Sequence, residues 1–97
     1  MVTEDFLMGC YKRAEEAFSK CIADPENRHL ERELKTSWER VRTVNSSIVM
    51  SFVGSDQGTL NVQTRLDLVS DEGIRVGYYR LDEDRSGNTL DDFLVFD

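Results

Sequence analysis

The stretch TLNVQTRLDLV, residues 59–69, alternates apolar and polar side chains along its length. A period of two is typical of a β-strand, whose successive side chains point to opposite faces of a sheet. One face would carry Leu60, Val62, Thr64, Leu66 and Leu68. The other would carry Asn61, Gln63, Arg65 and Asp67. The sequence therefore predicts an antiparallel strand with one buried face and one face toward water.

Three further stretches are rich in β-branched and aromatic residues: SSIVMSFVG, GIRVGYYRLD and DDFLVFD. Segments rich in Gly, Asp and Ser separate the four stretches, and these residue types build tight turns. Sequential strands joined by short turns favour an antiparallel meander. We predict strands at about 46–54, 59–69, 73–82 and 90–96.

The first half of the chain has the spacing of helices. Apolar residues recur every three or four positions from Leu7 to Ile22, after a possible N-cap at Thr3. Asp24 and Pro25 are typical of the start of a second helix. We predict helices at about 4–22 and 25–44. The expected fold class is α+β, a single domain over 1–97 with an N-terminal helical hairpin packed on one face of a four-stranded antiparallel meander sheet.

The other three predicted strands carry apolar residues on both faces. Ile48 alternates with Val49, Tyr78 with Tyr79, and Phe93 with Leu94. Apolar surface left on the second face of a sheet usually marks a contact site. We therefore expect a homodimer or a partner contact there. A β-bulge that turns some of these side chains inward is the alternative.

Composition narrows the class of protein. The chain has 97 residues and a net charge of −7. No apolar run approaches the roughly 18 residues of a membrane span, and the N-terminus carries acids where a secretory signal carries bases. We expect a cytoplasmic protein without a membrane contact. Cys10 and Cys21 are too few for a disulfide framework or a zinc site, so we expect two buried thiols, no metal and no cofactor.

The stretch RLDEDRSGNTLDDF, residues 80–93, begins like a calcium-binding loop. Asp82, Asp84 and Ser86 match its first ligand positions, and Gly87 matches its turn glycine. Position 12, which should supply a bidentate glutamate, is Phe93. The flanking segments alternate as strands, whereas helices flank an EF-hand loop. The stretch is expected to be the turn of an acidic hairpin, with a weak cation site as the alternative.

The negative charge lies in the second half of the chain, where residues 45–97 hold ten acids and four bases. A field of one sign selects and accelerates encounters with an oppositely charged partner. Our leading hypothesis is a non-enzymatic protein-interaction module, an adaptor, inhibitor or immunity-type binder, that presents an acidic sheet edge to a basic protein. The candidate partner-binding residues are Asp82, Glu83, Asp84, Asp91, Asp92, Tyr79 and Leu81.

Two other hypotheses stay open. A small-molecule-binding homodimer, possibly enzymatic, would have a pocket lined by Trp38, Tyr78, Tyr79 and Arg80. Nucleic-acid contact would use a basic ridge on the second helix formed by Arg28, Arg32, Lys35 and Arg42. The net charge disfavours nucleic acid, because the chain would repel phosphate. The one histidine, His29, is expected to be an exposed helix residue, and we do not expect an enzyme.

Overall fold

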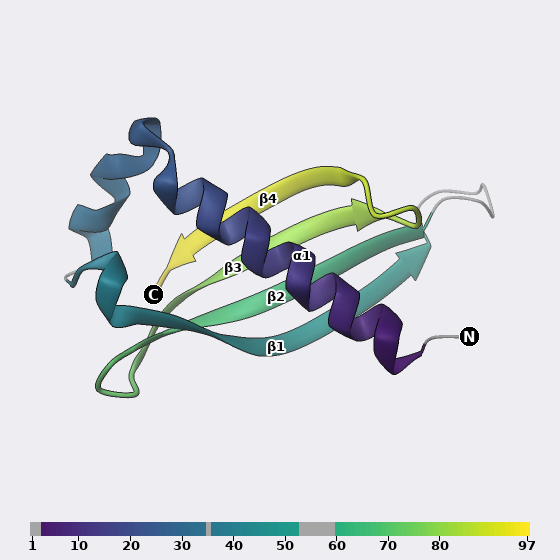
Figure 1. Ribbon diagram of the computed structural model, residues 1–97, viewed down its shortest axis with the longest axis horizontal. Helices are drawn as coiled ribbons and strands as arrows, with labels where there is room; N and C mark the ends of the chain where they lie inside the picture. Colours follow the sequence, from purple (N-terminus) through teal and green to yellow (C-terminus); the bar gives the residue numbers. More distant parts are fainter. Residues whose placement is uncertain (1–2, 35, 53–59) are drawn as a thin grey trace.

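The computed structural model describes residues 3–34, 36–52 and 60–97. Its helical elements are α1 (Glu4–Ala23) and the 3-10 helices η1 (Pro25–Leu34) and η2 (Trp38–Arg40). Its strands are β1 (Val41–Phe52), β2 (Leu60–Ser70), β3 (Arg75–Asp84) and β4 (Thr89–Phe96). The strands form one antiparallel sheet in the order β1-β2-β3-β4 (Figure 1). The predicted α+β class and four-stranded meander are confirmed.

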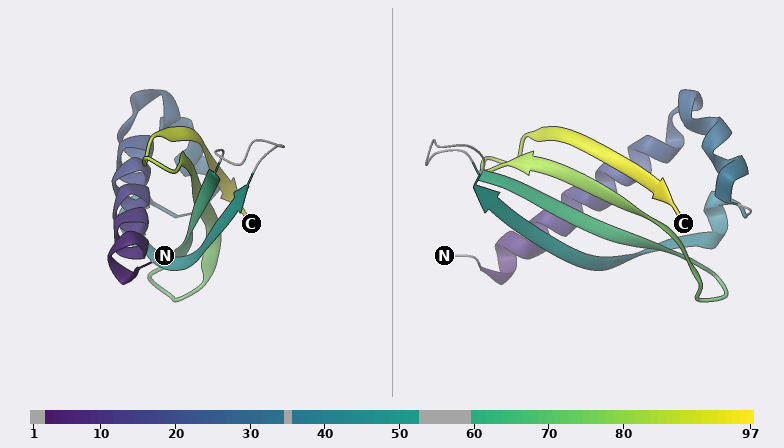
Figure 2. Two further views of the ribbon diagram at one scale, coloured as in Figure 1. Left: turned by 90° about the vertical axis from the view of Figure 1, so that its right-hand side faces the viewer. Right: turned by 180° about the vertical axis from the view of Figure 1, so that it is seen from behind.

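The molecule has two layers. α1 runs diagonally across one face of the sheet, which we call the covered face (Figure 1). No described element lies over the opposite, uncovered face (Figure 2). η1 turns away from the end of α1 at one end of the sheet, so the covered face depends mainly on a single helix.

The predicted second helix is wrong in type and extent. Residues 25–34 form a 3-10 helix rather than an α-helix, and the chain is already a strand at Val41. β1 pairs with β2 from Val41 opposite Ser70 to Phe52 opposite Leu60. The predicted strand at 46–54 would have left half of β2 without hydrogen-bond partners on that side, which is costly for a buried strand. The predicted strand residues 53, 54 and 59 lie outside the described residues.

The core lies between α1 and the two central strands. Cys10, Ala14 and Phe18 are four residues apart and form the buried stripe of α1. They face a set of buried sheet residues: Val62, Thr64, Leu66, Leu68, Tyr79 and Leu81. The burial of every second residue of β2 confirms the two faces predicted from its alternation. Thr3 also caps α1 as predicted, since its Oγ1 accepts a hydrogen bond from the backbone N–H of Phe6 at 3.1 Å.

Aromatic side chains close the core at the end of α1. The ring of Phe18 lies 5.7 Å from that of Trp38 and 5.5 Å from that of Tyr79, measured between centroids. Trp38 also lies 6.1 Å from Phe96 of β4. Pairs at these distances contribute about 0.5–1.5 kcal/mol beyond their area burial. The segment that was predicted to be helical thus packs through Trp38 against both α1 and the sheet.

Substitution of Ala14 by Leu tests how closely α1 approaches the sheet. Ala14 is fully buried in the core, so the larger side chain should overpack it and lower the free energy of unfolding by about 1–3 kcal/mol. Ala23→Leu is the matched control, because Ala23 is an exposed residue at the end of the same helix. It should change stability by less than about 0.5 kcal/mol in urea denaturation. Equal losses in the two variants would contradict the packing.

Candidate functional site

The uncovered face carries three cross-strand pairs on β3 and β4. Tyr78 lies opposite Val95, Arg80 opposite Phe93, and Asp82 opposite Asp91. Directly opposite residues of an antiparallel pair point to the same face. Phe93 and Val95 are exposed, as are Val44 and Val49 of β1 on this face. The apolar surface predicted for the second face is therefore present.

Arginine side chains stack on the aromatic rings of this face. The Cζ of Arg65 lies 4.0 Å from the centroid of the Tyr78 ring, and that of Arg80 lies 4.2 Å from the Phe93 ring. Each guanidinium also meets a carboxylate: Arg65 pairs with Asp67 at 3.4 Å, and Arg80 donates to both oxygens of Asp82 at 2.9 and 3.2 Å. A guanidinium held between a ring and a carboxylate is oriented and partly desolvated. The middle of the face is therefore ordered and close to neutral.

One end of the face is acidic. Asp91 lies directly opposite Asp82, and like charges at such positions repel each other. Arg80 offsets the charge of Asp82. Asp91 is exposed and makes no ion pair with any residue that the structure describes. We call Arg80, Asp82, Asp91, Phe93 and Val95 the acidic half-face.

Two of the other predicted acids, Glu83 and Asp92, lie on the covered face. Glu83 is 1% exposed, and Arg13 of α1 donates from Nε to its Oε2 at 2.7 Å. Asp92 accepts a hydrogen bond from the hydroxyl of Tyr79 at 2.8 Å. Burial, followed by this hydrogen bond, raises the pKa of Tyr79 well above its usual range, so the hydroxyl stays a donor. Glu83 therefore joins α1 to the sheet and is not available to a partner, whereas Asp92 links β4 to Tyr79 but remains exposed.

Tyr79 and Leu81, the two apolar members of the predicted partner site, are in the core. They lie three residues and one residue before Asp82 and point to the opposite face, because strand side chains alternate. Phe93 and Val95 hold the exposed apolar positions instead. The sequence signal for them was the alternation of DDFLVFD, but which parity faced the helix could not be read from it.

The segment from Asp84 to Asn88 is a tight turn between β3 and β4, as predicted. The carboxylate of Asp84 accepts three hydrogen bonds: from Ser86 N at 2.8 Å, from Asn88 N at 2.9 Å and from Asn88 Nδ2 at 3.0 Å. Gly87 has φ +85°, a left-handed conformation that glycine adopts without strain. The turn thus uses the Asp84 oxygens that a cation would need. No group of three or more possible metal-ligating side chains occurs within residues 3–34, 36–52 and 60–97.

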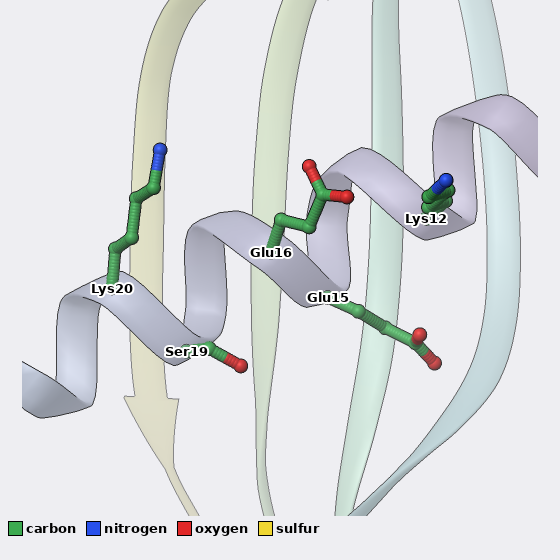
Figure 3. A pocket seen from close by; sticks show the side chains of 5 residues that line it. All are labelled: Lys12, Glu15, Glu16, Ser19 and Lys20. Carbon is green, nitrogen blue, oxygen red and sulfur yellow. The ribbon is translucent and has the colours of Figure 1, made fainter.

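The alternative ligand pocket is not assembled. Tyr78 and Arg80 lie on the uncovered face, whereas Tyr79 and Trp38 pack with Phe18 on the covered face. A shallow hollow occurs elsewhere, on the outer side of α1 (Figure 3). It is lined by Lys12, Glu15, Glu16, Ser19 and Lys20. A hollow built from the exposed side chains of one helix, with both signs of charge interspersed, is a solvated helix surface.

The basic ridge is not formed as predicted either. Arg28 and Arg32 are exposed on η1, but a 3-10 helix turns about 120° per residue, so residues four apart point in different directions. Arg42 lies on β1, and Lys35 is outside the described residues. His29 is exposed, as predicted.

The two thiols differ in surroundings. Cys10 is buried as predicted, and Cys21 is half-buried. Burial raises the pKa of each, so both stay protonated near neutral pH and are poor nucleophiles. Cys21 borders a hollow where α1, η1 and β4 meet, and Asn27 Nδ2 in that hollow already donates to the Cys21 carbonyl at 2.9 Å.

Substitution of Asp84 by Ala tests the turn through its pH dependence. The hydrogen bonds from Asn88, first its backbone N–H and then its side chain, lower the pKa of Asp84. A carboxyl whose pKa is lowered by folding stabilises the fold above its unfolded pKa of about 3.9, and this stabilisation is lost as the pH falls through the folded pKa. The variant should therefore melt below the parent at pH 7, and the difference should shrink toward pH 3.

Asp71→Ala is the control for that comparison. Asp71 lies in the β2–β3 turn, is exposed, and accepts no hydrogen bond from the described residues. Its variant should follow the parent at both pH values in thermal melts read by circular dichroism. A gap between Asp84→Ala and the parent that is unchanged at pH 3 would contradict a role of the ionised carboxylate.

Comparison with known proteins adds no identity. No protein-family model, no curated protein and no solved structure matches the chain. Among the described residues, no helix is both long and apolar enough to cross a membrane. The function has to be argued from the surfaces themselves.

Proposed function

We propose that this chain is a non-enzymatic protein-binding module, an adaptor, inhibitor or immunity-type binder, that uses the acidic half-face to bind a basic protein. The observation that carries the proposal is the exposed carboxylate of Asp91, which lies opposite Asp82, itself only 7% exposed, and on the same strand face as exposed Phe93 and Val95. Interfaces of this kind combine an apolar, aromatic centre with a charged rim.

The charge of the half-face favours a cationic group. A Lys or Arg of a partner placed against Asp91 would relieve its repulsion with Asp82. Arg80 does not pair with Asp91, because its Nε and Nη2 donate to Asp82 and its guanidinium lies over the Phe93 ring. The site therefore offers the carboxylate of Asp91, whose Oδ1 accepts a hydrogen bond from the backbone N–H of Asp92 at 2.8 Å and which has no ion pair among the described residues.

The rest of the acidic second half adds long-range attraction. Residues 75–97, which form β3, β4 and the turn between them, hold six acids and three bases, a net charge of −3. A field of this sign raises the association rate with a basic protein and weakens as salt increases. Buried Glu83 contributes charge but no contact surface, since Arg13 holds it on the covered face, whereas Asp92 is exposed and accepts from Tyr79.

Charge reversal at Asp91 tests the proposal. The tagged chain, Asp91→Lys and Glu16→Lys would each be used to capture proteins from lysate of the source cell at low salt. Glu16 is exposed on the outer side of α1, so its variant has the same change in net charge on the opposite surface. The parent and Glu16→Lys should retain a basic protein that high salt releases, and Asp91→Lys should retain at least about tenfold less.

Retention by Asp91→Lys at the level of the parent would contradict the acidic half-face as the binding site. Retention lost to the same extent in both variants would show that only net charge matters. Circular dichroism of the three proteins should be the same, because Asp91 and Glu16 are both exposed and neither forms an ion pair within the described residues.

A further inference from the structure

The two outer edges of the sheet are protected very differently. An edge strand has backbone N–H and C=O groups that are free to pair with another strand, and proteins guard them with short strands, charged side chains or proline. β4 has eight residues and contains Asp91 and Asp92. β1 has twelve residues, and Arg42 is the one charged residue in it.

The second part of β1 is the least protected segment. A register shift between Asn45 and Ser47 marks a bulge, after which Ser47–Phe52 pairs regularly with β2. This six-residue run has no charge, no proline and no glycine, and β-branched and aromatic residues favour extended structure. Its exposed apolar side chains include Met50 and Phe52, the latter 74% exposed.

No acid lies beside this run on the neighbouring strand. Ser47–Phe52 is paired with residues 60–65 of β2, whose one charged member is Arg65. The acids of the sheet are concentrated instead on β3 and β4, at the opposite edge. For a chain of net charge −7, the β1 edge is therefore the edge of the sheet whose own strand residues repel another acidic molecule of the same kind least.

We propose that the β1 edge pairs with the β1 edge of a second copy of this chain. The two strands would run antiparallel around a two-fold axis perpendicular to the sheet, which gives one continuous eight-stranded sheet with β4 at both ends. Two-fold dimers with an isologous contact are the commonest homo-oligomers. It is a different surface from the acidic half-face and does not depend on the proposed function.

The face alternation of β1 suits this symmetry. A two-fold axis perpendicular to the sheet keeps covered faces together, so Ile48, Met50 and Phe52 of both copies would share one apolar side of the joint. Both α1 helices would lie on that side, where the first turn of α1 extends past β1 (Figure 1). This turn contains Glu4 and Asp5, so like charges approach each other above the joint. Salt should therefore strengthen the dimer, whereas it should weaken binding of a basic partner.

Sedimentation velocity of the full chain and two lysine variants tests the dimer. Val49→Lys places a charged side chain on edge strand β1, and Val95→Lys places one on edge strand β4. The two valines are 51% and 37% exposed, and both lie on the uncovered face. The parent and Val95→Lys should dimerise with similar dissociation constants that fall as salt increases. Val49→Lys should dissociate at least about tenfold more readily, with an unchanged circular dichroism spectrum.

Three results would overturn the proposal. A parent chain that stays monomeric at all concentrations and salt levels would exclude a second copy as the occupant of the β1 edge. Equal weakening of the dimer by Val49→Lys and Val95→Lys would show that the added charge matters and that the strand carrying it does not. A monomeric parent that captures another protein, with capture lost in Val49→Lys alone, would assign this edge to a strand of that protein.

Discussion

Close packing of α1 on the centre of the sheet determines how the rest of the chain is arranged. Ala14 allows the helix backbone to approach β2 and β3, and Phe18 fills the adjoining space against Tyr79 and Trp38. Arg13 adds a polar link to this contact through buried Glu83, and breaking a buried ion pair is costly because it leaves one charge unpaired. A single helix covers one face, so the opposite face must be stable in contact with water. The stacking of Arg65 and Arg80 on aromatic rings provides that stability.

Strand alternation then gives neighbouring acids different roles. Asp82 and Glu83 are adjacent, yet one lies on the uncovered face beside Arg80 and the other under α1 beside Arg13. Asp91 and Asp92 also point to opposite faces, but both are exposed, and Asp92 accepts a hydrogen bond from Tyr79. Of the acidic cluster seen in the sequence, only part is therefore surface charge. The acids that remain outside lie toward β4, which leaves β1 as an edge without acids.

The elements that depend on local signals were predictable from sequence. α1 follows from its cap and apolar spacing, β2 from strict alternation, and the turn at 84–88 from residues that favour tight turns. The start of β1 was not predictable, because it is decided by pairing with Leu66–Ser70 on β2 rather than by local preference. The link between Arg13 and Glu83 joins residues 70 apart, and no sequence pattern indicates it. The predicted site was wrong where it depended on which face of the sheet a strand side chain occupies. Tyr79 and Leu81 were predicted to contact a partner but are buried, and Phe93 and Val95 were omitted.

We expect the two edges of the sheet to differ, with β1 joined to a second copy and acidic β4 exposed to solvent. Residue-resolved amide hydrogen exchange by NMR on the concentrated chain compares both edges in one sample. Alternate amides of Ser47–Phe52 point away from β2, as alternate amides of β4 point away from β3. We predict slow exchange for the outward amides of β1, because they would be hydrogen-bonded to the second copy. The outward amides of β4 should exchange fast, because they face water. Fast exchange at both edges would contradict the pairing of β1 with a second copy.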